Sequence, residues 1–82
     1  MDENKKNYIG TFSEKSLHAV IKNYYEPDIN KQEIPVEKYI ADIFNGQEII
    51  EIQTGQFHRM KEKLECFLLQ YPVIIVYPIA AE

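Results

Sequence analysis

Asn45 and Gly46 form the strongest short-range structural signal in this sequence. Both residues tolerate the positive φ angles of a two-residue type I′ turn, and such a turn joins antiparallel strands. The flanking segments, Lys38–Phe44 and Gln47–Gln53, are rich in the β-branched and aromatic residues typical of strands. We therefore expect a β-hairpin with a two-residue loop.

The register of this hairpin would divide its side chains between two faces. With a two-residue loop, Asp42 faces Ile49, Lys38 faces Gln53, and Glu51 becomes a diagonal neighbour of Asp42. One face is an ordinary core face, made of Tyr39, Ala41, Ile43, Glu48, Ile50 and Ile52. The other face mixes charged and apolar residues: Lys38, Ile40, Asp42, Phe44, Gln47, Ile49, Glu51 and Gln53.

The carboxylates of Asp42 and Glu51 stand out on the mixed face. Like charges at such a position repel and raise a pKa, unless a cation lies between them. Two carboxylates that leave other coordination positions to water and phosphate are a typical Mg²⁺ site. The alternative is a structural role, in which both acids are edge-strand charges that prevent edge-to-edge aggregation.

Two helices and a further strand surround the hairpin. A helix is expected over residues 12–25, because Thr11 and Glu14 fit a capping box and Pro27 stops it. A second helix is expected over residues 57–69. Its apolar stripe contains Phe57, Met60, Leu64, Phe67 and Leu68. Its basic residues are interpreted as a solvated face, with a nucleic-acid groove as the alternative: His58, Arg59, Lys61 and Lys63.

The remaining strands complete a small mixed sheet. Val73–Tyr77 is an uninterrupted β-branched and aromatic run, which predicts a strand buried on both faces and parallel to Gln47–Gln53. Glu33–Glu37 is expected to be an edge strand or a bend, because Pro35 cannot donate a ladder hydrogen bond. The expected fold is α/β (α+β) with the order α-β-β-α-β.

Composition limits what else the chain can be. Its 82 residues, 45% of them apolar, predict one globular domain over residues 11–82 after a loosely ordered segment 1–10, with a truncated domain as the alternative. A net charge of −4 argues against nucleic-acid binding by the whole surface. No apolar run approaches the roughly 20 residues of a membrane span. With no apolar stretch of a secretory signal after residues 1–6 either, the expected location is the reducing cytoplasm, and Cys66 cannot form an internal disulfide. So small a sheet leaves open edges, which favours a homodimer.

The hairpin also carries a family resemblance. Asp42, followed after eight residues by Glu51-Ile52-Gln53, resembles the D…ExK signature of the PD-(D/E)XK (restriction-endonuclease-like) nucleases, in the variant where Gln replaces Lys. The segments 41–43 (ADI) and 50–54 (IEIQT) are similar to small bacterial nuclease-like proteins. The resemblance implies a Mg²⁺- or Mn²⁺-dependent hydrolase of DNA phosphodiester bonds.

The resemblance implies roles for individual residues. Asp42 and Glu51 would bind the metal ion, Gln53 would occupy the lysine position and orient water, and Glu14 would be an auxiliary acid. Lys38, which lies across from Gln53 in the expected register, can supply the missing positive charge. The alternative for Glu14 is that it only caps the helix, and the alternative for Lys38 is that it is a solvated lysine without a role in the site. His18, four residues after Glu14, is interpreted as an ordinary boundary residue.

Two other classes of function remain open. A catalytically inactive module with a nuclease fold would bind nucleic acid or protein. A purely structural oligomer subunit would bind neither metal nor nucleic acid. The small size and the Gln at the lysine position favour the inactive module, whereas the carboxylate pair favours the enzyme. Affinity for a divalent cation separates these possibilities.

Overall fold

The computed structural model describes residues 14–54 and 60–78. Its elements are helix α2 (Glu14–Tyr25), the 3-10 turn η1 (Ile29–Lys31), strands β1 (Gln32–Val36), β2 (Tyr39–Phe44) and β3 (Ile49–Ile52), helix α3 (Lys61–Leu68) and strand β4 (Val73–Val76). The segment 1–10, Thr11 of the expected capping box and residues 57–59 of the expected second helix lie outside the described residues.

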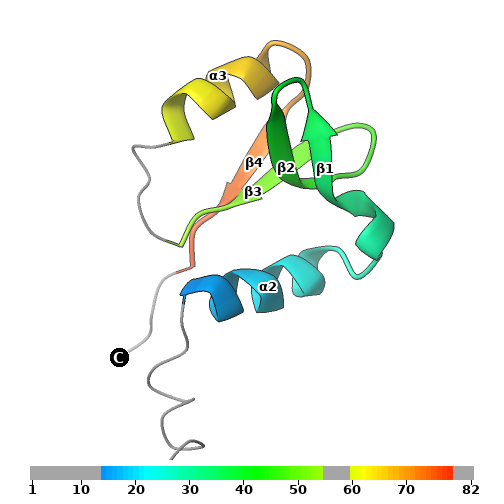
Figure 1. Cartoon of the computed structure of the whole chain (residues 1–82), viewed down its shortest axis with the longest axis vertical. Helices are drawn as coiled ribbons and strands as arrows, with labels where there is room; N and C mark the ends of the chain where they lie inside the picture. The colour runs from blue at the N-terminus through cyan, green and yellow to red at the C-terminus, as the bar shows by residue number, and fades with distance from the viewer. Residues whose placement is uncertain (1–13, 55–59, 79–82) are drawn as a thin grey trace, which may run out of the picture.

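The four strands form one mixed sheet in the order β1-β2-β3-β4. The pairs β1–β2 and β2–β3 are antiparallel, whereas β4 runs parallel to β3 after the crossover through α3. Helices α2 and α3 lie on opposite sides of the sheet (Figure 1). The fold is therefore the small mixed α+β fold that the sequence predicts, and the parallel pairing of the last strand is confirmed.

Side chains tie the end of α2 to the first strand. Pro27 follows the helix, whose last backbone hydrogen bond runs from the Glu26 N–H to the Lys22 carbonyl. The Gln32 amide donates to the Glu26 carbonyl at 2.7 Å, and the Lys22 ammonium pairs with the Glu33 carboxylate. These contacts fix α2 against the edge of the sheet.

β1 is an edge strand, as Pro35 predicts. Pro35 pairs with Ile40 of β2, and its missing N–H breaks no bond to a further strand because β1 is outermost. The following turn places Glu37 at a φ of 57°. β2 begins directly after this turn, at Tyr39.

β4 is the other edge strand, and the prediction that it is buried on both faces is wrong. Ile74 is 44% exposed and Ile75 is 38% exposed. Apolar β-branched runs are typical of central parallel strands, but here no described strand lies beyond β4 to cover it. The apolar run correctly indicated a strand and did not indicate its place in the sheet.

The hydrophobic core lies mainly between the sheet and α3. Phe67 is fully buried, and its ring meets the Tyr39 ring edge-on at 6.1 Å between centroids. The core includes residues from both expected hairpin faces: Tyr39 and Ala41 from one, Phe44 and Ile49 from the other. The prediction that one face alone forms the core is therefore wrong.

The hairpin loop is longer than predicted. The observed register pairs Ile43 with Ile50 and Phe44 with Ile49, so four residues, 45–48, connect the strands. The Asn45 carboxamide oxygen accepts hydrogen bonds from the N–H groups of Gln47 and Glu48, both at 2.9 Å. This side-chain turn stabilises the wider loop instead of the two-residue turn.

Among the helices of residues 14–54 and 60–78, none is both long and apolar enough to cross a membrane.

Candidate functional site: a carboxylate pair between two helices

Asp42 and Glu51 face one another across the β2–β3 hairpin. They are the next residues along the register after Ile43 and Ile50, so they are directly opposite and not diagonal as the two-residue loop predicted. Glu51 is only 1% exposed, and the Asp42 side chain is 13% exposed. The structure therefore brings the two predicted metal ligands together in a largely buried position.

Each carboxylate accepts a backbone N–H from the facing strand. The Asp42 N–H donates to Glu51 Oε2 at 2.8 Å, and the Ile52 N–H donates to Asp42 Oδ2 at 2.8 Å. Hydrogen bonds from backbone N–H groups favour the ionised form of a carboxylate. The two side chains thus continue the pairing of the strands where the backbone ladder ends.

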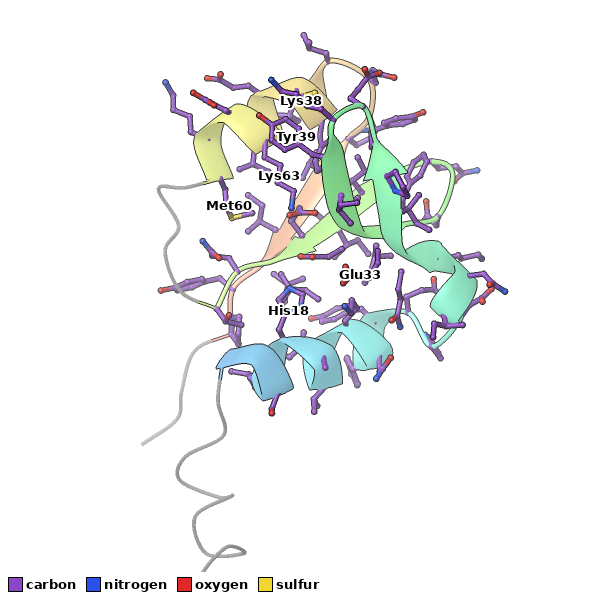
Figure 2. All side chains as sticks on the ribbon, viewed as in Figure 1. His18, Glu33, Lys38, Tyr39, Met60 and Lys63 are labelled. Carbon is purple, nitrogen blue, oxygen red and sulfur yellow. The ribbon has the colours of Figure 1, made fainter. Side chains whose placement is uncertain are left out.

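Lys63 neutralises Glu51 from the α3 side. Its Nζ lies 2.8 Å from Glu51 Oε1, and its side chain is only 24% exposed (Figure 2). The ammonium also lies 5.8 Å from the centroid of the Phe67 ring. The sequence interpretation, which assigned Lys63 to a solvated face, is wrong.

A signal for Lys63 was present in the sequence. Lys63 lies three residues after Met60 and four before Phe67, and both neighbours belong to the expected apolar stripe. That spacing places its stem on the buried side of the helix. A basic residue on such a stripe indicates a buried acidic partner.

His18 reaches the pair from the opposite side. Its Nε2 lies 3.2 Å from Asp42 Oδ2, and the ring projects from α2 toward the sheet (Figure 2). When protonated, this imidazole pairs electrostatically with Asp42. Each carboxylate therefore contacts a base from a different helix, a contact that the boundary-residue interpretation of His18 missed.

Burial raises the pKa of Glu51 above its ordinary value, and the nearby charge of Asp42 raises it further. The hydrogen bond and the charge of Lys63, together with the Asp42 N–H, act in the opposite direction and lower this pKa. The net rise means that the folded protein holds this proton more tightly than the unfolded chain does.

This rise predicts how stability depends on pH. Protonated Glu51 favours folding, and this contribution is complete below the unfolded value of about 4.5 and is lost as the pH rises through the raised folded pKa. We therefore expect Glu51→Gln to gain stability relative to wild type across that window. Urea unfolding followed by circular dichroism between pH 4 and 8 measures the difference. Glu65→Gln, which alters an exposed acid, is the control. A Glu51→Gln advantage that shrinks with rising pH would contradict the assignment.

Gln53 lies directly after β3, two residues beyond Glu51. The residue is 9% exposed, and its Nε2 has no hydrogen-bond partner among the described residues. An unpaired buried amide donor costs about 1–3 kcal/mol. Its backbone N–H, in contrast, donates to the Val76 carbonyl at 2.9 Å and fixes the residue against β4. Gln53 therefore has an unused side-chain donor two residues after Glu51 in the sequence.

The two auxiliary residues of the prediction have different outcomes. Lys38 lies in the turn between β1 and β2, and its Nζ is 5.7 Å from the centroid of the Tyr39 ring (Figure 2). The longer hairpin loop removes its expected pairing with Gln53, so the structure does not bring Lys38 to the carboxylates. Glu14 begins α2, and the position of its side chain lies outside the description.

Two carboxylates are the acidic ligands that the described residues offer to a metal ion at this position. Within residues 14–54 and 60–78, no cluster of three or more His, Cys, Asp or Glu side chains is placed to hold a metal ion. Mg²⁺ is commonly bound by only one or two carboxylates, with waters and substrate phosphates as the other ligands. Asp42 and Glu51 meet that smaller requirement.

Comparisons with known proteins place the chain in a family. Residues 15–82 match a family model described as Domain of unknown function (DUF8091). A relative from Treponema pallidum (strain Nichols), which carries the name Uncharacterized protein, is 33% identical over 73 residues, which are 88% of this chain and 29% of the relative. The chain thus spans less than a third of that relative's length. No solved structure matches this chain significantly. Because the family model covers most of the sequence, the chain belongs to the family described as Domain of unknown function (DUF8091).

Proposed function

We propose that Asp42 and Glu51 hold one divalent cation, Mg²⁺ or Mn²⁺, and that the chain hydrolyses phosphodiester bonds of DNA at this site. The observation that carries the proposal is the pair of opposed, buried carboxylates with Lys63 against one of them at 2.8 Å. Buried charges that shift a pKa occur most often at functional sites.

The order of elements supports the same proposal. An α2 helix, three antiparallel strands, the α3 crossover and a parallel fourth strand give α-β-β-β-α-β. Both acids lie on the central hairpin, as the resemblance to PD-(D/E)XK nucleases implies. We propose that the fold is restriction-endonuclease-like and that Asp42 and Glu51-Ile52-Gln53 form a variant of that motif.

The residues around the pair have separate roles in this proposal. A bound divalent cation would polarise a phosphate oxygen and lower the pKa of a water ligand. Lys63 supplies the positive charge that Gln53 lacks, and it stabilises the negative charge that develops on the phosphate. The free Nε2 donor of Gln53 orients the attacking water. Water forms the new bond to phosphorus, and the ester oxygen leaves with a proton.

His18 is a positioning residue in this scheme. Its contact with Asp42 Oδ2 restrains the carboxylate that also accepts the Ile52 N–H. Contacts of this kind orient the ligands of a metal, and their loss typically lowers metal affinity about 10–100-fold. Glu14 stays a predicted auxiliary acid, whereas Lys63 takes over the role predicted for Lys38, which the observed register does not bring to the carboxylates.

The test is calorimetric titration of Mn²⁺ and Mg²⁺, followed by assays of branched and linear DNA hydrolysis. We expect saturable binding by wild type. Asp42→Asn/Glu51→Gln should lose this binding, and its hydrolysis should fall at least about 100-fold, because even the loss of residues that only contact metal ligands costs about 10–100-fold. Asp28→Asn/Glu65→Gln removes two exposed acids and controls for net charge. Binding that survives in Asp42→Asn/Glu51→Gln would refute the metal assignment.

A second candidate is the inactive module with the same fold. The observation that favours it is the Lys63–Glu51 ion pair, since this pair already compensates the buried charge with a side chain. Wild type would then fold cooperatively, bind no divalent cation, and still bind DNA or protein.

The partners proposed for the chain are DNA and a second copy of itself, and the proposed location is the cytoplasm. Cys66, a free and partly buried thiol, is compatible with a reducing compartment.

A further inference from the structure

The outer edge of β4 is an open strand edge. β4 is the last strand of the sheet, and no strand among the described residues pairs with its outer side. Strands of this kind are templates for pairing with another chain unless charges, prolines or bulges block them. Residues 73–76 read Val-Ile-Ile-Val and contain no such block.

The backbone of β4 shows which groups are free. The carbonyls of Pro72 and Val76 accept hydrogen bonds from Ile49 and Gln53 of β3. Backbone groups alternate in direction along a strand, so those of Ile74 also face β3. The N–H and C=O groups of Val73 and Ile75 therefore face outward.

The sequence on both sides of β4 is uncharged. Between Glu65 and Glu82 the sequence contains no charged residue, although the whole chain has a net charge of −4. Pairing of two copies along this segment would therefore bring no like charges together. Along β4 itself, Ile74 and Ile75 are 44% and 38% exposed.

An apolar groove continues the same surface onto α2. Its volume is about 370 Å³, and it lies between α2 and the end of β4. The lining residues are Val20, Ile21, Tyr24, Tyr25, Val76, Tyr77 and Pro78. Val20 is 51% exposed and Tyr24 is 79% exposed, so this face of α2 is also uncovered by the described residues.

We propose that a second copy of the chain occupies this surface, with β4 pairing antiparallel to β4 of its partner. A two-fold axis perpendicular to the sheet would join the two sheets into one of eight strands. It would also place both α2 helices on the same side, next to each other across the seam. One occupant thus covers the strand edge, the groove and the apolar face of α2. The proposal specifies the second copy named as a partner under the proposed function, and it does not depend on metal binding or hydrolysis at the carboxylate pair.

A second copy fits better than an unrelated partner, because the surface complements itself. Antiparallel pairing around a two-fold axis requires the same strand on both sides, and an uncharged strand meets this condition without like-charge contacts. A charged peptide or nucleic acid would find no complementary charge along β4.

Size-exclusion chromatography with light scattering tests the proposal on the full chain. We expect wild type to be a dimer at high concentration. Ile75→Pro, which removes an outward N–H, and Ile75→Lys, which adds a charge to the edge, should weaken dimerisation at least 10-fold. Leu69→Lys is the control, because Leu69 is 85% exposed but lies outside β4. Circular dichroism confirms that each variant is folded.

Hydrogen exchange on wild type gives a second measurement that needs no variant. The amides of Val73 and Ile75 should become protected as the protein concentration rises, while that of Ile74 is protected throughout. A monomer at all concentrations, or exchange at Val73 and Ile75 that does not change with concentration, would overturn the proposal. Equal weakening by Leu69→Lys and by the Ile75 variants would also overturn it.

Discussion

Replacing Lys63 with Met is expected to lower the free energy of unfolding by about 3–5 kcal/mol at neutral pH. The Met side chain keeps the apolar stem but removes the ammonium 2.8 Å from Glu51 Oε1. The carboxylate would then lie buried without a cation and beside the charge of Asp42. Removing one partner of a buried ion pair costs far more than the pair contributes. Urea unfolding followed by circular dichroism measures the change.

The chain offers a matched control and a rescue. Lys61, on the same helix, pairs with Glu65 at 3.7 Å, but both side chains are more than 60% exposed. Lys61→Met should therefore change stability by no more than about 0.5 kcal/mol. Adding Glu51→Gln to Lys63→Met should restore most of the lost stability, because the neutral amide still accepts the Asp42 N–H. An equal cost for Lys63→Met and Lys61→Met would show that Glu51 does not need this cation.

Replacing Phe67 with Ala is expected to cost about 3–5 kcal/mol of stability. Phe67 is fully buried, and its ring packs against Tyr39 and beneath the ammonium of Lys63. Truncation removes the contacts of both partners and leaves a cavity between α3 and the sheet. A small domain has only about 5–15 kcal/mol in total, so this change brings the chain near its unfolding threshold.

The neighbouring residue provides the control for this prediction. Leu68 lies next to Phe67 on α3 but is 59% exposed. Leu68→Ala should change stability by no more than about 0.5 kcal/mol, because surface truncations leave no cavity. Thermal and urea unfolding of both variants test the difference. Similar costs for the two changes would mean that the core does not depend on Phe67.

The elements with strong local signals are the ones that the sequence predicts correctly. Pro27 marks the end of α2, Pro35 marks an edge strand, and the run from Val73 gives a strand parallel to β3. The predicted burial of β4 on both faces was wrong, since hydrophobicity alone does not determine how many strands lie beyond a given strand. Both acids of the site were found because they alternate onto one face of a strong hairpin.

The remaining features depend on tertiary contacts. Local turn propensity favours two residues at Asn45-Gly46, but the Asn45 side chain stabilises a four-residue loop by accepting two backbone N–H groups. The apolar stripe of the second helix marks Lys63 as partly buried, but it does not identify Glu51 as its partner, and nothing in the sequence pairs His18 with Asp42. The packing of α3 and α2 on the sheet brings them together.

The carboxylates that extend the pairing of β2 and β3 also select one hairpin over another. In the register of a two-residue loop every side chain would keep its face, so the hydrophobic pattern does not distinguish the two arrangements. Asp42 would then lie opposite Ile49, and its carboxylate would lose the Ile52 N–H. The two acids thus discriminate against a competing conformation of the same segment. A variant that lacks both would be free to populate two hairpins where the native chain has one.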